Sequence, residues 1–144
     1  MSSLASIFVT PVSALIPVPS DLIGKVWDVA SPYLKQALDE SAGDYTLGDV
    51  RRFLDSADAQ LWVIYQDGIP CGAMTTRITA YPTKPVCEFW LYAGALPSNF
   101  AELLGEVETW ARELGCSRLR INGRRGWARK LGWTERSTVA DKCL

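Results

Sequence analysis

The sequence predicts one α/β domain in which helices pack on a mixed, mostly antiparallel β-sheet. The chain has 144 residues, enough for one domain with a substantial core, because a domain of this size buries roughly two thirds of its unfolded surface. Strand patterns joined by turn signals fill the middle of the chain, and the apolar spacing changes to the helical period after Pro97. The 48% hydrophobic and 22% charged residues are typical of a globular protein that folds alone. We therefore expect a single domain over residues 1–144.

The first third of the chain predicts a strand followed by helices. Ile7–Val12 is expected to form the opening strand. Apolar residues at helical spacing over Leu22–Leu38 predict a helix, which Pro32 is expected to divide into two pieces. Thr46 is expected to cap a short helix in YTLGDVRRFLDS.

The middle of the chain predicts three strands. QLWVIYQDGIPCGAMTTRITAYP is typical of two strands joined by a tight turn at Asp67 and Gly68, which is a strong hairpin signal. KPVCEFWLYAGA predicts the third strand, and Pro82 and Pro85 lie at the turn before it.

The last third begins with the clearest element, an amphipathic helix over Asn99–Leu114 that ends at Gly115. Trp110 shares its apolar stripe and is expected to lie in the core. A strand in SRLRI, a short helix in the segment GRRGWARKLGW and a final strand near Thr134–Val139 follow. We interpret GRRGWARKLGW chiefly as a packing joint between the last strands.

Charge and residue usage limit the chemistry. Residues 112–136 hold eight of the 15 basic residues but only two of the 16 acidic ones, so positive potential is concentrated there. The chain has four cysteines without CxxC spacing and no histidine. A zinc site, a thioredoxin-like motif and a histidine-based nucleophilic mechanism are therefore not supported. We expect no metal, buried thiols in a reducing compartment, no signal peptide and no membrane span.

The order of elements and several phrases carry a family resemblance. YTLGDVRRF, QLWVIYQDG, YPTKPVC and GCSRLRINGRRGW together resemble short GNAT-like proteins of tailed bacteriophages and prophages, within the GNAT superfamily of acetyl-CoA-dependent N-acetyltransferases. The resemblance implies a sheet splayed between its fourth and fifth strands, with helices on both faces. It also implies a protein of the host bacterial cytoplasm, either free or incorporated in the virion.

The resemblance places acetyl-CoA in the splay between the strand at Val86–Ala93 and the strand at Arg118–Asn122. The pantetheine arm would follow the first strand, and the pyrophosphate would lie on N–H groups at the start of the next helix. The cofactor-binding residues implied in this way are Leu91, Ala93, Gly94, Ala95, Ser98 and Asn99. The loop YAGALPSNF departs from the glycine-rich family motif, which predicts weak or lost acetyl-CoA binding. Arg124 and Arg125 could replace the lost contacts through their guanidinium groups, or could be ordinary surface arginines.

The resemblance also predicts that a general acid for the chemical step is missing from its usual position. Family members often carry a tyrosine acid four residues before a Gly-aromatic pair, and counting back from Gly132 and Trp133 leads to Ala128. Tyr92 or Tyr81 could replace this acid.

Glu88 is the candidate general base, because some relatives carry a glutamate on this strand. Strand alternation predicts Glu88, Trp90 and Tyr92 on one face of the sheet and Cys87, Phe89 and Leu91 on the other. A glutamate among aromatic rings would have a raised pKa, as a base requires. The alternative is an edge-facing or salt-bridged Glu88.

Three functions are consistent with these observations. The first is an active N-acetyltransferase with an amine substrate and Glu88 as base. The second is a non-catalytic structural or adaptor component of a phage particle that contacts other phage proteins. The third, nucleic-acid binding through the basic last third, is the least favoured, because that segment lies partly on a strand and partly in a core helix.

Overall fold

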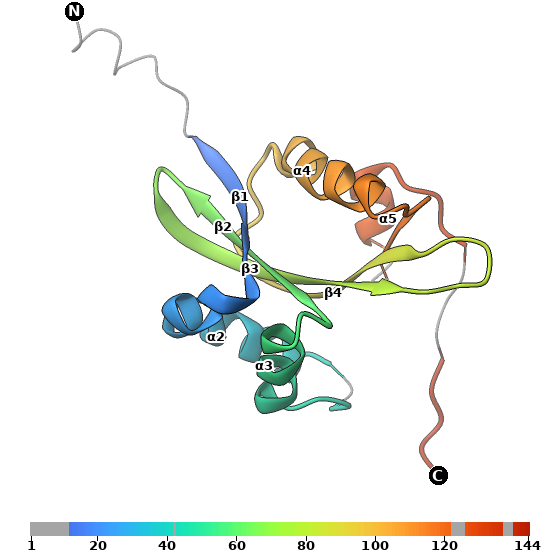
Figure 1. The fold of residues 1–144 in the computed structure, drawn as a ribbon, viewed down its shortest axis with the longest axis horizontal. Coiled ribbons are helices and arrows are strands. Elements are labelled where there is room, and N and C mark those ends of the chain that lie inside the picture. The colour runs from blue at the N-terminus through green and yellow to red at the C-terminus, as the bar shows by residue number, and fades with distance from the viewer. Residues whose placement is uncertain (1–11, 42, 122–125, 137–139) are drawn as a thin grey trace, which may run out of the picture.

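The computed structural model describes residues 12–41, 43–121, 126–136 and 140–144. These residues form a five-stranded sheet with the order β1-β2-β3-β4-β5. Neighbouring strands are antiparallel except β4 and β5, which are parallel. Figure 1 shows α2 and α3 on one face of the sheet and α4 and α5 on the other. The predicted mixed sheet with helices on both faces is confirmed. The elements are β1 (Ser13–Val18), the 3-10 turn η1 (Ser20–Leu22), α2 (Ile23–Asp39), α3 (Leu47–Asp55), β2 (Gln60–Gln66), β3 (Ile69–Thr79), β4 (Val86–Gly94), α4 (Phe100–Glu113), β5 (Leu119–Ile121) and α5 (Gly126–Leu131).

The first strand and first helix differ from the sequence prediction. β1 begins at Ser13, after the stretch expected to form the opening strand, most of which lies outside the described residues. Pro17 is tolerated in β1 because this strand is at the edge of the sheet, where a missing N–H need not break a ladder. α2 is one continuous helix through Pro32, so the expected break is wrong. Pro32 is exposed, and water can therefore bond the carbonyl that loses its helical partner.

Two local signals from the sequence are confirmed. The Thr46 hydroxyl accepts a hydrogen bond from the Asp49 N–H at 3.1 Å, and the Thr46 N–H donates to the Asp49 carboxylate at 2.8 Å, which together form a capping box. The β2–β3 turn has positive φ at both Asp67 (53°) and Gly68 (77°), as a type I′ hairpin requires.

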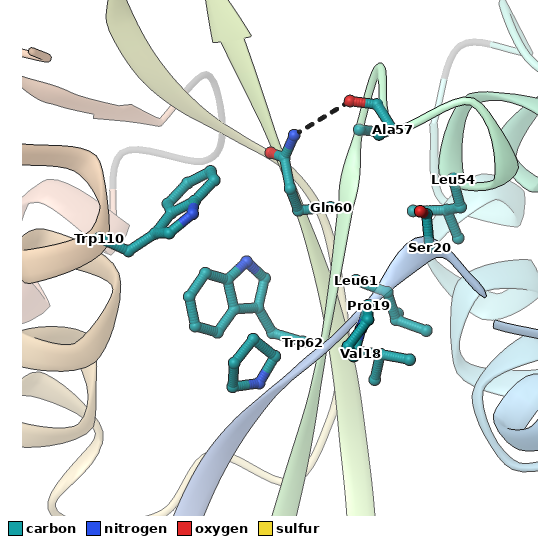
Figure 2. A pocket seen from close by; sticks show the side chains of 11 residues that line it. Val18, Pro19, Ser20, Leu54, Ala57, Gln60, Leu61, Trp62 and Trp110 are labelled. Atoms are coloured by element: carbon teal, nitrogen blue, oxygen red, sulfur yellow. Dashed lines mark hydrogen bonds between the residues drawn. The ribbon is translucent and has the colours of Figure 1, made fainter. Parts of the chain in front are cut away.

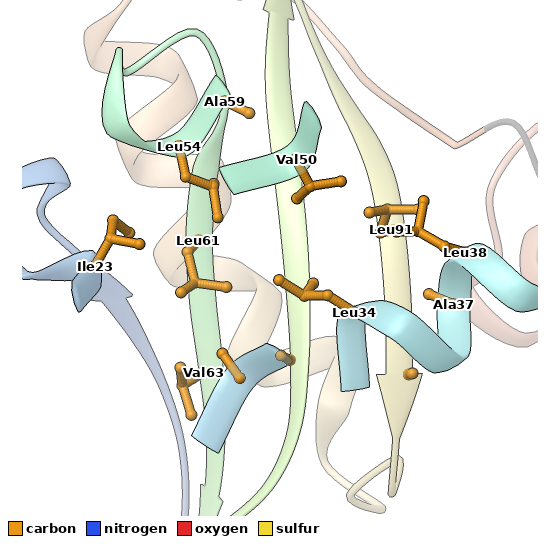
Figure 3. Packing of buried hydrophobic residues seen from close by; sticks show 13 residues of the cluster. Ile23, Leu34, Ala37, Leu38, Val50, Leu54, Ala59, Leu61, Val63 and Leu91 are labelled. Atoms are coloured by element: carbon orange, nitrogen blue, oxygen red, sulfur yellow. The ribbon is translucent and has the colours of Figure 1, made fainter. Parts of the chain in front are cut away.

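The sheet separates two hydrophobic clusters. The α2/α3 core lies under α2 and α3 (Figure 3) and consists of Ile23, Ala30, Leu34, Ala37, Leu38, Val50, Leu54, Ala59, Leu61, Val63, Ala73, Leu91 and Ala93. The α4 core lies on the other face and consists of Leu15, Trp62, Ile64, Met74, Cys87, Phe89, Phe100, Leu104, Val107, Ala111 and Cys116. Trp110 is only half-buried at the margin of the α4 core, where its ring meets the Trp62 ring edge to face at 5.5 Å. Its expected place inside the core is thus only partly met.

The segment at the end of α5 packs on the sheet at β4. Leu131 joins the margin of the α4 core, and Trp133 stacks on Phe89 with ring centroids 5.6 Å apart. These contacts support the interpretation of this segment as a packing joint. Residues 134–136 and 140–144 form no strand, so the predicted final strand is absent there, and residues 137–139 lie outside the described part. None of the described helices has the length and apolar character that crossing a bilayer requires.

Candidate functional site

In the part of the chain that the structure describes, the sheet is open between β4 and β5 beyond Phe89. The two strands pair only over Cys87–Phe89 and Leu119–Ile121. β4 continues to Gly94, so within the described residues its second half has no strand partner on the β5 side. This opening is the place that the family resemblance assigns to acetyl-CoA.

A β-bulge lies at the point where β4 leaves β5. Thr75 of β3 faces Leu91 and Thr76 faces Phe89, which leaves Trp90 as the extra residue. The Thr75 hydroxyl, which is fully buried, accepts a hydrogen bond from the Leu91 N–H at 3.1 Å. A buried side-chain hydroxyl therefore bonds the backbone N–H that directly follows the bulged residue.

The bulge reverses the alternation of side chains along β4. Cys87, Phe89 and Tyr92 belong to the α4 side, whereas Leu91 and Ala93 belong to the α2/α3 core. The faces predicted for Leu91 and Tyr92 are therefore wrong. The extra residue in a bulge shifts the alternation of the side chains that follow it by one position. The two candidate catalytic residues, Glu88 and Tyr92, lie on opposite faces of the sheet and are not brought together.

The loop after β4 is held against β3. A second bulge, at Cys71 of β3, leaves the Cys71 carbonyl free to accept the Ala95 N–H at 2.8 Å. Gly94 has φ +106°, and a Cβ there would lie 2.4 Å from the Cys71 oxygen. Gly94 thus allows the loop to approach β3 closely, and Ala95 bonds the loop to it. A phosphate at this loop would have to compete for the Ala95 N–H.

The other implied cofactor residues lie nearby. Ser98 is exposed and Asn99 is half-buried at the start of α4, where the Asn99 side chain makes no capping hydrogen bond. The Asn99 carbonyl accepts from N–H groups of the first turn, and the Phe100 N–H donates to the Pro97 carbonyl at 3.0 Å. Arg124 and Arg125 lie outside the described residues.

Tyr92 ties the loop to the strand. Its hydroxyl donates to the Ala95 carbonyl at 2.7 Å, and its ring meets the Phe100 ring edge to face at 5.5 Å. Burial raises the pKa of Tyr92 well above its usual value, with a smaller contribution from Cys71. A phenol with a raised pKa is a poor proton donor in neutral solution.

Glu88 is ion-paired. Its carboxylate accepts from the Arg120 guanidinium at 3.2 Å, and the same nitrogen donates to the Tyr81 hydroxyl at 2.7 Å. The hydrogen bond to Tyr81 is the main cause that raises the pKa of Arg120, and the electrostatic interactions with Tyr81 and then Glu88 add to it. The Glu88 side chain is 23% exposed. The structure therefore favours the salt-bridged alternative for Glu88 over a base isolated among aromatic rings.

Sequence reasoning missed Arg77 on the same face. Its guanidinium lies over the rings of Trp90, Phe53 and Tyr45, at 4.8, 5.5 and 5.8 Å from their centroids. A charged residue within the otherwise uncharged run CGAMTTRITA was the signal that could have drawn attention to it.

A separate pocket of about 230 Å³ lies between the end of β1 and the start of β2, at the opposite edge of the sheet from β5. Figure 2 shows Trp62 and Trp110 on one side of it and Leu54 on the other. Two of its lining residues share a buried partner outside the pocket: the Trp62 indole N–H donates to Thr76, whose hydroxyl donates to Gln60. No group of three or more His, Cys, Asp or Glu residues in the described ranges could hold a metal ion.

Comparisons with known proteins agree on the fold. The sequence matches no protein-family model and no curated protein. Solved acetyltransferase structures match at low identity. Aminoglycoside N-acetyltransferase AAC(6')-Iy in complex with CoA is 15% identical, with a TM-score of 0.68, over 95% of this chain and 97% of that one. An aminoglycoside acetyltransferase from an uncultured soil metagenomic sample, in complex with sisomicin, is 12% identical, with a TM-score of 0.67, over 92% and 95%. A GNAT family acetyltransferase of Staphylococcus aureus is 12% identical, with a TM-score of 0.60, over 94% and 100%.

These likenesses extend over almost the whole of each chain. At such identities they establish the architecture and leave the chemistry open. The protein therefore has the GNAT acetyltransferase fold.

Proposed function

We propose that this protein is a phage-encoded N-acetyltransferase homologue with a degenerate acetyl-CoA loop, and that it acts as a non-catalytic structural or adaptor component of the phage particle. The hydrogen bond from the Ala95 N–H to the Cys71 carbonyl carries the proposal, because it uses a loop donor that a pyrophosphate would need. The phage assignment rests on the sequence resemblance alone.

Two further features support weak cofactor binding. Pro97 has no N–H to offer, and the Phe100 N–H is already bonded to the Pro97 carbonyl. The loop between β4 and α4 and the first turn of α4 contain one negatively charged residue, Glu102, and no lysine or arginine. Acetyl-CoA should therefore bind with a Kd in the millimolar range or weaker, which corresponds to about -4 kcal/mol.

Isothermal titration calorimetry of the full chain with acetyl-CoA tests this proposal. We expect no heat of binding below about millimolar concentrations. A micromolar Kd would contradict the proposal. Loss of that binding in the double variant Arg124→Gln/Arg125→Gln, but not in Arg112→Gln, would then assign the phosphate contacts to the arginine pair. Arg112 is a suitable control because it lies exposed in α4 and pairs with Glu108 of the same helix.

An active N-acetyltransferase with Glu88 as base is the second candidate. It is favoured by the position of Glu88 on β4, directly before the bulge where β4 leaves β5, and by its partial exposure. Glu88 would have to accept a proton while paired with Arg120.

Consumption of acetyl-CoA, measured by chromatography with a panel of amines that includes sisomicin, tests this second candidate. Turnover that disappears in Glu88→Gln and persists in Glu108→Gln would establish it and overturn the non-catalytic proposal. No turnover with any amine at saturating acetyl-CoA would exclude Glu88 catalysis for that panel.

A further inference from the structure

Three charged residues form a row across the sheet on the α2/α3 face. Arg77 of β3 is the register partner of Glu88, and Glu88 is the register partner of Arg120 on β5. Directly opposed residues in a sheet point to the same face, and adjacent strands are about 5 Å apart. All three side chains are partly accessible, because Arg77 is half-buried and the Glu88 and Arg120 side chains are 23% and 31% exposed.

The charges in this row do not balance. Glu88 pairs with Arg120, while Arg77 makes no ion pair with a carboxylate in the described ranges. The side chain of Arg77 makes one hydrogen bond to described residues, from Nη1 to the Tyr45 hydroxyl at 3.3 Å. A guanidinium has five N–H donors. Among the described residues, Arg77 therefore keeps unused donors at a half-buried position, and Arg77, Glu88 and Arg120 together carry one net positive charge.

Aromatic rings hold this guanidinium in place. The rings of Trp90, Phe53 and Tyr45 surround it and also meet one another edge to face, with centroids 4.9 to 6.0 Å apart. Rings interact with the flat faces of a guanidinium, whereas its N–H groups point outward in the plane. The arrangement fixes the orientation of the donor edge before any ligand arrives, which lowers the entropy cost of binding.

Arg51 shows the same arrangement with its acid present. Its guanidinium lies over the Trp27 ring at 5.0 Å, and its Nε donates to both oxygens of Asp55 at 3.0 Å. Arg77 has the rings, but no carboxylate of the described residues forms an ion pair with it.

We propose that Arg77 and Glu88 form a binding site for a small amino-carboxylate ligand of the α-amino acid type. The ligand carboxylate binds the donor edge of Arg77, which matches a carboxylate in a bidentate manner. The ligand ammonium binds Glu88 on the neighbouring strand, since a carboxylate has about four acceptor positions and Arg120 occupies one in the described structure. This site lies on the α2/α3 face beside the opening between β4 and β5, and its occupation does not depend on catalysis.

The test is an NMR titration of the 15N-labelled full chain in the absence of acetyl-CoA. L-Alanine is compared with propionate, which lacks the ammonium, and with ethylamine, which lacks the carboxylate, at matched ionic strength. The Trp90 indole N–H, assigned by its loss in Trp90→Phe, and the Arg77 Nε–H report binding. We expect saturable shifts with L-alanine in the millimolar range. Propionate should bind at least about tenfold more weakly, and ethylamine should not bind, because each leaves a charged group without its partner.

Variants decide which residues are responsible. Arg77→Lys keeps the positive charge but loses the planar guanidinium that makes a bidentate contact with a carboxylate. It should weaken L-alanine binding at least about tenfold. Glu88→Gln should reduce L-alanine to the affinity of propionate. Arg51→Gln, the matched arginine on a ring, should bind as the wild type does.

Three results would overturn the proposal: no saturable shift up to about 100 mM L-alanine, unchanged binding in a folded Arg77→Lys protein, or equal loss in Arg51→Gln. Thermal unfolding of each variant confirms that it is folded, and if Arg77→Lys does not fold, the ligand comparison on the wild type decides. Propionate binding as tightly as L-alanine, or ethylamine binding at all, would then refute the amino-carboxylate assignment. Since acetyl-CoA is absent, failure here leaves the acetyl-CoA proposal untouched.

Discussion

The β4 bulge should depend on one hydroxyl group. Thr75 is fully buried, and its Oγ1 accepts the Leu91 N–H at 3.1 Å. Thr75→Val keeps the shape of the side chain and removes the acceptor. An unpaired buried N–H costs about 1–3 kcal/mol, whereas the added methyl group contributes about 0.8 kcal/mol through burial. We therefore expect a net loss of about 0.2–2.2 kcal/mol in the free energy of unfolding, and a fall in Tm of up to roughly 9 °C for a chain of this length.

Urea unfolding and amide hydrogen exchange measure the two parts of this effect. The unfolding midpoint should fall in Thr75→Val, and the Leu91 amide should exchange faster than in the wild type. Thr79→Val is the matched control on the same strand, because Thr79 is half-buried. Its effect should stay within about 0.5 kcal/mol. An unchanged midpoint together with unchanged Leu91 exchange in Thr75→Val would refute the view that this hydroxyl holds the bulge.

Three other predictions concern separate features. Gly94→Ala should destabilise the protein by more than about 1–3 kcal/mol, the usual cost of a strained backbone, because its Cβ would also lie 2.4 Å from a β3 carbonyl oxygen; unchanged urea unfolding would count against this packing. Hydrogen bonds at the N-terminus of α3 lower the pKa of Asp49 below its unfolded value, so its stabilising contribution is present above that value and is lost as pH falls through the folded pKa. Asp49→Asn should therefore flatten the acid side of the stability curve below about pH 4, and a curve parallel to that of the wild type would contradict the assignment. Burial raises the pKa of Cys87 to about 12, so native protein should be alkylated at exposed Cys143 and not at Cys87; modification of both at equal rates, detected by mass spectrometry, would be the opposite result.

The elements that the sequence predicted well have local causes. The Asp67–Gly68 turn, the capping box at Thr46 and the apolar stripe of α4 each depend on residues only a few positions apart. The continuity of α2 through Pro32 could not be predicted in this way, because packing of the helix against the sheet compensates for the unfavourable proline.

The candidate site depended on contacts between distant residues. The ion pair of Glu88 with Arg120 joins positions 32 residues apart, and the hydrogen bond from Arg77 to the Tyr45 hydroxyl also spans 32 residues. The bulge at Trp90 is set by the register of β4 against β3, and no local pattern shows which residue is left unpaired. The sequence could therefore nominate Glu88 and Tyr92 but could not place them on opposite faces of the sheet.

The composition of the α2/α3 core sets an order of assembly during synthesis. Its members lie between Ile23 and Ala93, and none of them comes from the later described residues. Chains emerge from the ribosome N-terminus first, at about 5–20 residues per second, so this half of the protein can condense before α4 has emerged. The other face of the sheet, which includes Trp62, Ile64 and Met74, then stays open to solvent until Phe100 and Leu104 arrive. The newborn chain is thus most exposed to aggregation in the interval between completion of β4 and docking of α4.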